Sequence, residues 1–169
     1  MFVPSQAAMT PRTIFSSHLE AIMADLFQDT FEKYTSVCKP ALGDCYWYLL
    51  PDLDIKLYPC FTWTNQESVD RYLSGNFFIS HEEARDARLK LMYYLSCNNS
   101  FHPLPEHPYY YLTLDGAHGY TTVKDYDHSI ISVKNCYRSQ MEADYMWLNI
   151  RYQLYNITID ARLRTSATA

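Results

Sequence analysis

Three neighbouring residues in the second half of the chain carry side chains that can bind a metal ion. Asp125, Asp127 and His128 supply two carboxylates and an imidazole, which are common ligands of catalytic cations. In a strand, however, alternation places Asp125 and Asp127 on one side and His128 on the other, and Asp-rich loops are common without any metal. A metal-dependent enzyme is therefore an alternative, while the main expectation is no catalytic residue, no metal and no other cofactor.

Aromatic side chains on two predicted hairpins offer a different chemistry. The first strand of one hairpin carries Tyr46 and Tyr48, and the first strand of the other carries Tyr109 and Tyr111. Exposed tyrosines anchor protein interfaces at a low cost in conformational entropy. They also stack on bases, so a nucleotide pocket with Arg71 or Arg138 as its cation is an alternative. A third interpretation makes these tyrosines core residues with hydrogen-bonded hydroxyl groups.

The composition excludes several classes of function. The chain has 169 residues, enough for one domain, and its 4 Gly cannot form a dinucleotide-binding fingerprint or a phosphate-binding P-loop. The net charge of -5 argues against a duplex nucleic-acid partner. The 5 Cys include no C-x-x-C pair and are expected to be buried, reduced thiols. We find no signal-peptide pattern and no apolar run of roughly 18 residues, and we expect a cytoplasmic protein that does not contact a membrane.

Hydrophobic periodicity predicts the elements of the N-terminal half. These are an amphipathic helix over residues 15–36, strands over 45–50 and 55–63 that form an antiparallel hairpin, and a helix over 81–96. Residues 1–14 show no periodic pattern and are expected to form a flexible arm. Ser17 with Glu20, and Ser80 with Glu83, have the spacing of a capping box, and we expect each pair to begin a helix.

The C-terminal half repeats these cues after a Pro-rich linker. Its predicted elements are the extended linker over 97–108, strands over 109–114 and 120–123, a short strand over 129–133, and a helix from 140 to about 155. Ser139 and Glu142 form a third capping box at the start of this helix. The small, polar tail over 160–169 is expected to fray, which leaves a single domain over 15–159.

An internal repeat relates the two halves. When the chain is shifted by 59 positions, residues 74–95 fall on residues 133–154, and seven of the 22 positions are identical. Asn76 and Asn135 match within the turn, and both capping boxes match as well. The sequence therefore predicts an α+β fold in which the N-terminal helix is followed by two similar strand–strand–helix units, over residues 45–96 and 109–156.

One segment of the first unit resembles a known motif. Gly75–Ala84, preceded by Trp63 and by Asp70-Arg71, resembles a strand–turn–helix motif of small, uncharacterised bacteriophage and mobile-element proteins, which reads D-x-x-R and then G-N-x-F-x-[ST]-x-E-E-A. The second unit departs from this motif, with Lys134 in place of Gly and Met141 in place of the first Glu. The resemblance implies a phage or mobile-element source, and hence the cytoplasm of a bacterial host, but no reaction and no catalytic residue.

These observations favour a non-catalytic accessory protein that acts by binding a host or partner protein, including the possibility of countering a host defence. The tyrosines of the hairpins, Arg71 and Arg138 are the predicted binding residues. A protein that binds or sequesters a nucleotide-like small molecule is the first alternative, and the metal-dependent enzyme is the second. A homodimer is compatible with every one of these functions.

Overall fold

The computed structural model describes the backbone of residues 11–115, 120–123 and 127–169, and it shows a mixed helix-and-strand protein. The elements in chain order are α1 (Pro11–Val37), β1 (Tyr46–Leu49), β2 (Ile55–Tyr58), α2 (Gln66–Leu73), α3 (His81–Asn98), β3 (Tyr109–Leu112), β4 (Tyr120–Val123), α4 (His128–Ser132) and α5 (Gln140–Ala167). The predicted α+β class is confirmed.

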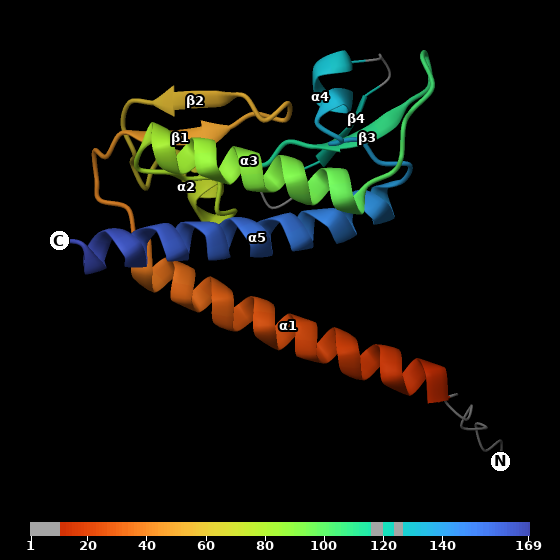
Figure 1. Cartoon of the computed structure of the whole chain (residues 1–169), viewed down its shortest axis with the longest axis horizontal. Coiled ribbons are helices and arrows are strands. Elements are labelled where there is room, and N and C mark those ends of the chain that lie inside the picture. The colour runs from red at the N-terminus through yellow and green to blue at the C-terminus, as the bar shows by residue number, and fades with distance from the viewer. Residues whose placement is uncertain (1–10, 116–119, 124–126) are drawn as a thin grey trace.

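Two antiparallel hairpins lie over a layer of long helices (Figure 1). β1 pairs with β2, and β3 pairs with β4, each through four residues of each strand. Each hairpin is followed by a short helix, a tight turn and a long helix, so each unit contains one helix more than predicted. We call β1 to α3 unit one and β3 to α5 unit two. Among the long helices, α5 lies between α3 and α1.

A buried asparagine side chain fastens the turn before each long helix. Asn76 accepts a hydrogen bond from the backbone of the last β1 residue at 2.7 Å and donates one back to it at 2.8 Å. The same amide donates to the carbonyl oxygen of Leu114, in the loop after β3, at 2.8 Å. Asn135 repeats this pattern with the last β3 residue and with Pro51, in the loop after β1. Each asparagine therefore ties its own first strand to a loop of the other unit.

The residue before each asparagine has a left-handed backbone. Gly75 has a φ of 81° and Lys134 a φ of 63°. A Cβ atom on Gly75 would lie 2.9 Å from the Tyr155 ring, which is closer than packed atoms allow. Unit one therefore requires glycine at this turn, whereas unit two places a lysine in the same backbone conformation.

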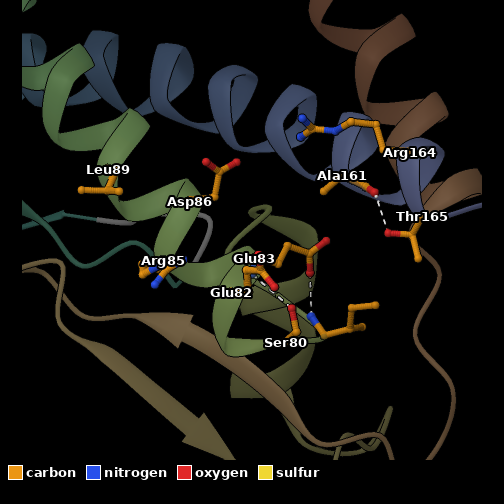
Figure 2. Close-up of a pocket in the computed structure, with 10 residues that line it drawn as sticks. Ser80, Glu82, Glu83, Arg85, Asp86, Leu89, Ala161, Arg164 and Thr165 are labelled. Atoms are coloured by element: carbon orange, nitrogen blue, oxygen red, sulfur yellow. Dashed lines mark hydrogen bonds between the residues drawn. The ribbon is translucent and has the colours of Figure 1, made fainter. Parts of the chain in front are cut away.

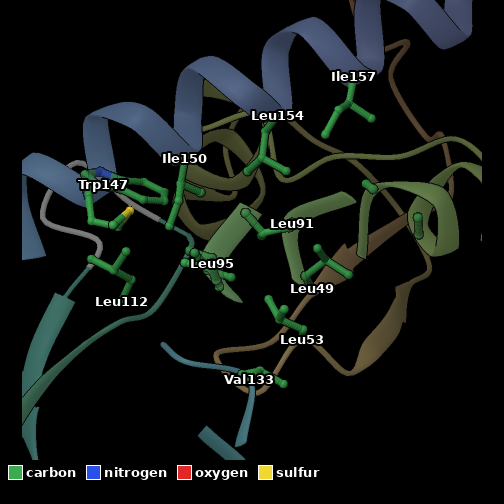
Figure 3. Packing of buried hydrophobic residues seen from close by; sticks show 14 of the residues in the cluster. Leu49, Leu53, Leu91, Leu95, Leu112, Val133, Trp147, Ile150, Leu154 and Ile157 are labelled. Atoms are coloured by element: carbon green, nitrogen blue, oxygen red, sulfur yellow. The ribbon is translucent and has the colours of Figure 1, made fainter. Parts of the chain in front are cut away.

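The main core lies between the two hairpins and the helices α3 and α5 (Figure 3). Leu91 and Leu95 of α3 pack with Ile150 and Leu154 of α5, and all four are fully buried. A second cluster joins α1 to the rest of the protein and is mostly aromatic; it contains Tyr34, Tyr46, Phe61, Tyr72, Phe77 and Tyr155. These two clusters hold α3 and α1 on opposite flanks of α5.

The start of the chain differs from the prediction. α1 begins at Pro11, so residues 11–14 belong to a helix and not to a flexible arm, while residues 1–10 lie outside the described part of the chain. Ser17 and Glu20 lie within this helix and do not begin it. The physical reason is that proline suits the first helical position, where its missing N–H costs no hydrogen bond.

Several strand predictions differ from the structure: some strands are shorter than predicted, and one predicted strand is a helix. β2 ends at Tyr58, directly before Pro59, which cannot donate to a strand partner. The helix α2 was not predicted; Asn65 caps it by accepting a hydrogen bond from the backbone of Ser68. The predicted strand over 129–133 is the helix α4, because a short apolar run fits either structure and the capping residue before it decides.

The C-terminal tail also differs from the prediction. α5 continues to Ala167, so most of the tail over 160–169 is helical and does not fray. Arg162 supports this extension through an ion pair with Glu83 at the start of α3, with a distance of 3.1 Å between Nε and Oε1.

All five cysteines are free thiols, but Cys45, Cys60 and Cys97 are exposed and only Cys38 and Cys136 are buried as predicted.

Candidate functional site

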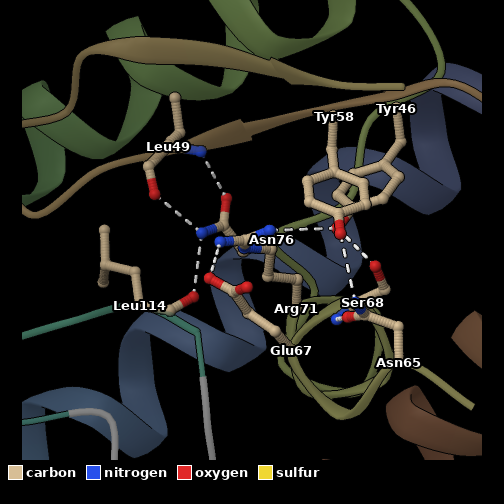
Figure 4. Close-up of polar contacts among 9 residues, drawn as sticks. All are labelled: Tyr46, Leu49, Tyr58, Asn65, Glu67, Ser68, Arg71, Asn76 and Leu114. Atoms are coloured by element: carbon tan, nitrogen blue, oxygen red, sulfur yellow. Dashed lines mark hydrogen bonds and ion pairs between the residues drawn. The ribbon is translucent and has the colours of Figure 1, made fainter. Parts of the chain in front are cut away.

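Two of the predicted binding residues of unit one, Tyr46 and Arg71, belong to an internal cluster (Figure 4). The Tyr46 side chain is fully buried, and its hydroxyl group lies 2.9 Å from the Ser68 hydroxyl. Arg71 is also buried; its Nη1 donates to the Tyr46 hydroxyl at 3.1 Å, and its Nη2 pairs with the carboxylate of Glu67. Tyr46 is therefore a core residue with a bonded hydroxyl group, as the third interpretation of the tyrosines requires.

The charge of Arg71 is paired within the protein through Nη1 and Nη2, whereas its buried Nε has no hydrogen-bond partner. Its guanidinium carbon lies 3.7 Å from the centre of the Tyr48 ring, which is a short cation–π contact. Burial by itself lowers the pKa of Arg71. The hydrogen bond to Tyr46 and the neighbouring Tyr48 and Glu67 raise it by more, so the pKa of Arg71 lies above its ordinary value. A charge that is paired, stacked and buried in this way is poorly placed to bind a phosphate from solution.

The predicted residues of unit two are divided between core and surface. Tyr109 is buried, and its hydroxyl group accepts a hydrogen bond from the backbone of Asp127 at 3.1 Å. Burial raises the pKa of Tyr109 and also that of the half-buried Tyr111. Arg138 is exposed, 5.3 Å from the centre of the Phe101 ring, and lies far along the chain from Arg71 in a different unit. The predicted residues therefore do not form one continuous binding face.

The predicted metal ligands have structural surroundings. Asp125 lies outside the described residues. Asp127 caps α4: its side chain accepts hydrogen bonds from the backbone N–H and the hydroxyl group of Ser129, and these bonds lower the pKa of Asp127. His128 is the first residue of that helix. Within residues 11–115, 120–123 and 127–169, no three His, Cys, Asp or Glu residues lie close enough together to hold a metal ion.

Several surface hollows in the described part of the chain lie along one side of the contact between α3 and α5. Three of them, of about 460, 390 and 490 Å³, share lining residues and form one groove, which we call the α3–α5 groove. Leu89, Lys90 and Arg164 each line two of the three hollows. The groove runs from Gln153 near the end of α3 to Thr165 near the start of α3, because α3 and α5 are antiparallel.

One end of the α3–α5 groove is charged, as Figure 2 shows for the start of α3 and the end of α5. Glu82, Arg85 and Asp86 of α3 line this end together with Arg164 of α5. Asp86 is also paired with Lys90, at 2.7 Å on a half-exposed part of the helix. The mixture of signs suits a polar protein segment better than a small molecule that carries charge of one sign.

The other end of the groove is apolar. It is lined by Leu89, Tyr93, Tyr94 and Cys97 of α3 and by Ile157 of α5. Leu89 is 59% exposed and Tyr93 is 73% exposed, although both are large apolar or aromatic side chains on a regular helix. Neighbouring exposed side chains of this kind are typical of contact sites for other macromolecules.

The internal repeat explains what kind of segment this surface fits. Leu89 and Tyr93 match Leu148 and Tyr152 of α5 at the offset of 59 positions. In unit two, α1 lies against these two residues: they line one small hollow together with Phe27 of α1. In unit one, the matching face of α3 has no such helix within the described part of the chain. Sequence reasoning used both identities as signs of a repeat but missed their place in a groove.

No helix in the described part of the chain is both long and apolar enough to span a bilayer. Comparison of the chain with models of protein families, with curated proteins and with solved structures finds no significant match to any of them.

Proposed function

We propose that the protein is a non-catalytic accessory protein of a phage or mobile element, acting in the cytoplasm of a bacterial host. Its α3–α5 groove binds an amphipathic helix of a partner protein, and a host defence protein is one such partner. The observation that carries this proposal is the exposed pair Leu89 and Tyr93, whose counterparts on α5 lie against the helix α1.

The chemistry of the groove defines the partner segment. A helix that places large apolar side chains three and four positions apart can contact Leu89, Tyr93 and Ile157 along one face. Polar side chains at one end of the same helix would meet the charged end of the groove, which is lined by the cations Arg85 and Arg164 and the anions Glu82 and Asp86. Apolar contacts therefore supply affinity, while the charged end selects the direction in which the helix lies.

The proposal is tested by comparing matched variants in one capture experiment. Leu89→Glu and Tyr93→Glu each place a charge at the apolar end of the groove, and Leu104→Glu places one at an equally exposed leucine in the linker. Wild type and variants are used to capture proteins from a bacterial host lysate, and captured proteins are quantified by mass spectrometry.

We expect at least one partner to be retained by wild type and by Leu104→Glu, and to be reduced about tenfold or more by either groove variant, as for a residue at an interface hot spot. Circular dichroism would show that the variants are folded, because both substituted side chains are exposed. If all four proteins capture the same partners equally, the α3–α5 groove is not the binding site. If wild type captures none, the proposed function is wrong.

A further inference from the structure

The helices α1 and α5 run in the same direction but separate toward their N-termini (Figure 1). Near its C-terminal end α1 is held firmly: Tyr34 is fully buried and its ring lies 4.7 Å from that of Tyr155. Toward the other end the two helices diverge (Figure 1), and one small hollow that they share is lined by Leu26 and Leu148. Beyond this point the backbones of the two helices lie progressively farther apart (Figure 1).

Both diverging helix segments carry apolar side chains that remain exposed. On α5 these are Met141, which is 80% exposed, Tyr145, which is 69% exposed, and Leu148, which α1 covers in part and which remains 42% exposed. On α1 they are Ile22, which is 49% exposed, and Leu26. We call these five residues the splayed face. The spacings of four and three residues on α5, and of four on α1, are those of a helix–helix seam of the coiled-coil type.

The fold itself does not require apolar residues at the start of α5. At the matching positions of α3, unit one has Glu82 where unit two has Met141, and Asp86 where unit two has Tyr145. Acidic residues suit the first turns of a helix, because they interact favourably with its dipole. Unit two keeps Glu142 in the first turn but replaces the other two acidic residues with an exposed methionine and an exposed tyrosine, which points to a contact outside the single chain.

The diverging part of α1 also needs support. From Pro11 to Leu26 it spans roughly 24 Å at 1.5 Å per residue, and isolated helices of about this length are only marginally stable in water. The backbone of its own α5 diverges from this part of α1 (Figure 1). A helix from outside, lying between the separated ends of α1 and α5, would contact both apolar stripes at once.

We infer that the outside helix is the N-terminal half of α1 from a second copy of this chain, so that two copies exchange these segments and form a symmetric dimer. The α1 segment of each copy packs on the α5 stripe of the other, and the two α1 segments lie side by side. This arrangement is closed by a two-fold axis and uses the same surface of both copies, as most homodimers do. Each copy supplies the stripe that the other leaves uncovered, so no third component is required.

The expected size of the contact agrees with a stable dimer. Each exchanged segment is roughly 24 Å long and about 10 Å wide and is enclosed by two helices of the partner, which approaches the area of about 800 Å² per partner found in standard interfaces. The α3–α5 groove lies on the opposite flank of α5 and stays open in this dimer. The inference is therefore independent of the proposed function.

The test measures the mass of the full chain in solution by analytical ultracentrifugation. At about 100 μM we expect wild type to have twice the chain mass of 19.9 kDa. Ile22→Lys changes the α1 stripe, and the double variant Met141→Glu/Tyr145→Asp gives the start of α5 the acidic residues of unit one. Each is expected to be a monomer, while Leu104→Glu, away from the splayed face, remains a dimer.

Mixing the two monomeric variants then tests the exchange itself. In the mixture, one intact α1 stripe meets one intact α5 stripe, and in the second contact the introduced ammonium group faces the introduced carboxylates. We expect the mixture to recover the dimer mass. Wild type that is monomeric, variants that all remain dimers, or a mixture that stays monomeric would each overturn the inference. If Ile22→Lys alone breaks the dimer while the α5 variant does not, the two α1 helices pair with each other and α5 is not the partner surface.

Discussion

Unit one and unit two fasten their turns in the same way but fill the space behind them differently. In both units a buried asparagine bonds the first strand, and a Ser and Glu pair caps the long helix. Behind the turn, unit one has the paired and stacked Arg71, whereas unit two has Ile130 at the matching position. The turn allows few alternatives, because each of its polar groups needs a specific partner. The core only needs its volume filled and its polar atoms bonded.

The asparagine substitutions are the strongest test of this comparison. Asn76→Ala removes three buried hydrogen bonds and leaves their backbone partners unsatisfied, so we expect the free energy of unfolding to fall by about 3–5 kcal/mol. Asn135→Ala should cost a similar amount, since it makes the matching three bonds. Urea denaturation measures the free energy of unfolding of both variants. Asn156→Ala, at a half-buried position in α5, serves as the control. A cost below about 1 kcal/mol for one asparagine alone would show that the two turns are not energetically equivalent.

The residues before the asparagines should respond in opposite directions. Gly75→Ala should lower the free energy of unfolding by about 2–3 kcal/mol, because the backbone is left-handed and the new Cβ meets Tyr155. Lys134→Gly should raise it by about 0.5 kcal/mol, because glycine relieves the strained backbone at the cost of greater freedom in the unfolded chain. Thermal unfolding of both variants checks the signs. A loss of stability in Lys134→Gly would mean that the lysine side chain itself contributes.

The two capping glutamates differ in burial and should differ in energy. Glu83 is buried and accepts hydrogen bonds from the backbone of Ile79 and from Arg162, so Glu83→Gln should cost about 2 kcal/mol by leaving that arginine without its counter-charge. Glu142 faces the exposed Arg138 at 3.8 Å, and Glu142→Gln should cost about 0.3 kcal/mol. Urea denaturation in low and high salt separates them, since salt should reduce only the second effect. Equal costs would contradict this difference in burial.

The caps of the short helices should differ in their dependence on pH. Asp127 caps α4 with a carboxylate whose folded pKa is lowered by the hydrogen bonds from Ser129, while Asn65 caps α2 without a charge. Asp127→Ala should cost about 1 kcal/mol at neutral pH. Because the folded pKa is depressed, this stabilisation is present above the unfolded pKa of about 3.9 and is lost as the pH falls through the folded value.

Asn65→Ala provides the matched variant for this last prediction. It should also cost about 1 kcal/mol, but its cost should not change as the pH falls, because the amide does not titrate in this range. Urea denaturation from neutral pH to about pH 3 compares the two costs. A cost of Asp127→Ala that stays constant with pH would show that the cap does not depend on the ionised carboxylate.

Local hydrogen-bonding rules could be predicted from the sequence, and contacts between distant segments could not. The capping boxes at Ser80 and Ser139 begin helices as predicted, because both partners of each bond lie within four residues. The same spacing at Ser17 failed, since a Ser and a Glu three residues apart also occur inside helices. At residues 129–133 the apolar run was too short to distinguish strand from helix, and Asp127 decided the outcome.

The candidate site depended most on distant contacts. Strand alternation correctly brings Tyr46 and Tyr48 to one face of β1, but it cannot show that α1 and Arg71 cover that face from positions far along the chain. The exposure of Leu89 and Tyr93 has the same origin, because nothing in the sequence of α3 states that α1 packs on the matching face of α5 and not on this face of α3. The groove is therefore a property of the packing and not of any single segment.

The crossed amide bonds of Asn76 and Asn135 have a consequence for how the chain unfolds. Each unit holds one hydrogen-bond donor that only the other unit can satisfy, through the carbonyl oxygens of Leu114 and Pro51. If either unit opened alone, the buried asparagine amide of the other unit would lose one hydrogen-bond acceptor. The main core also contains residues of both units. Unfolding of one unit alone therefore costs both a buried hydrogen bond and part of the shared core. We expect the two units to unfold together in one all-or-none transition.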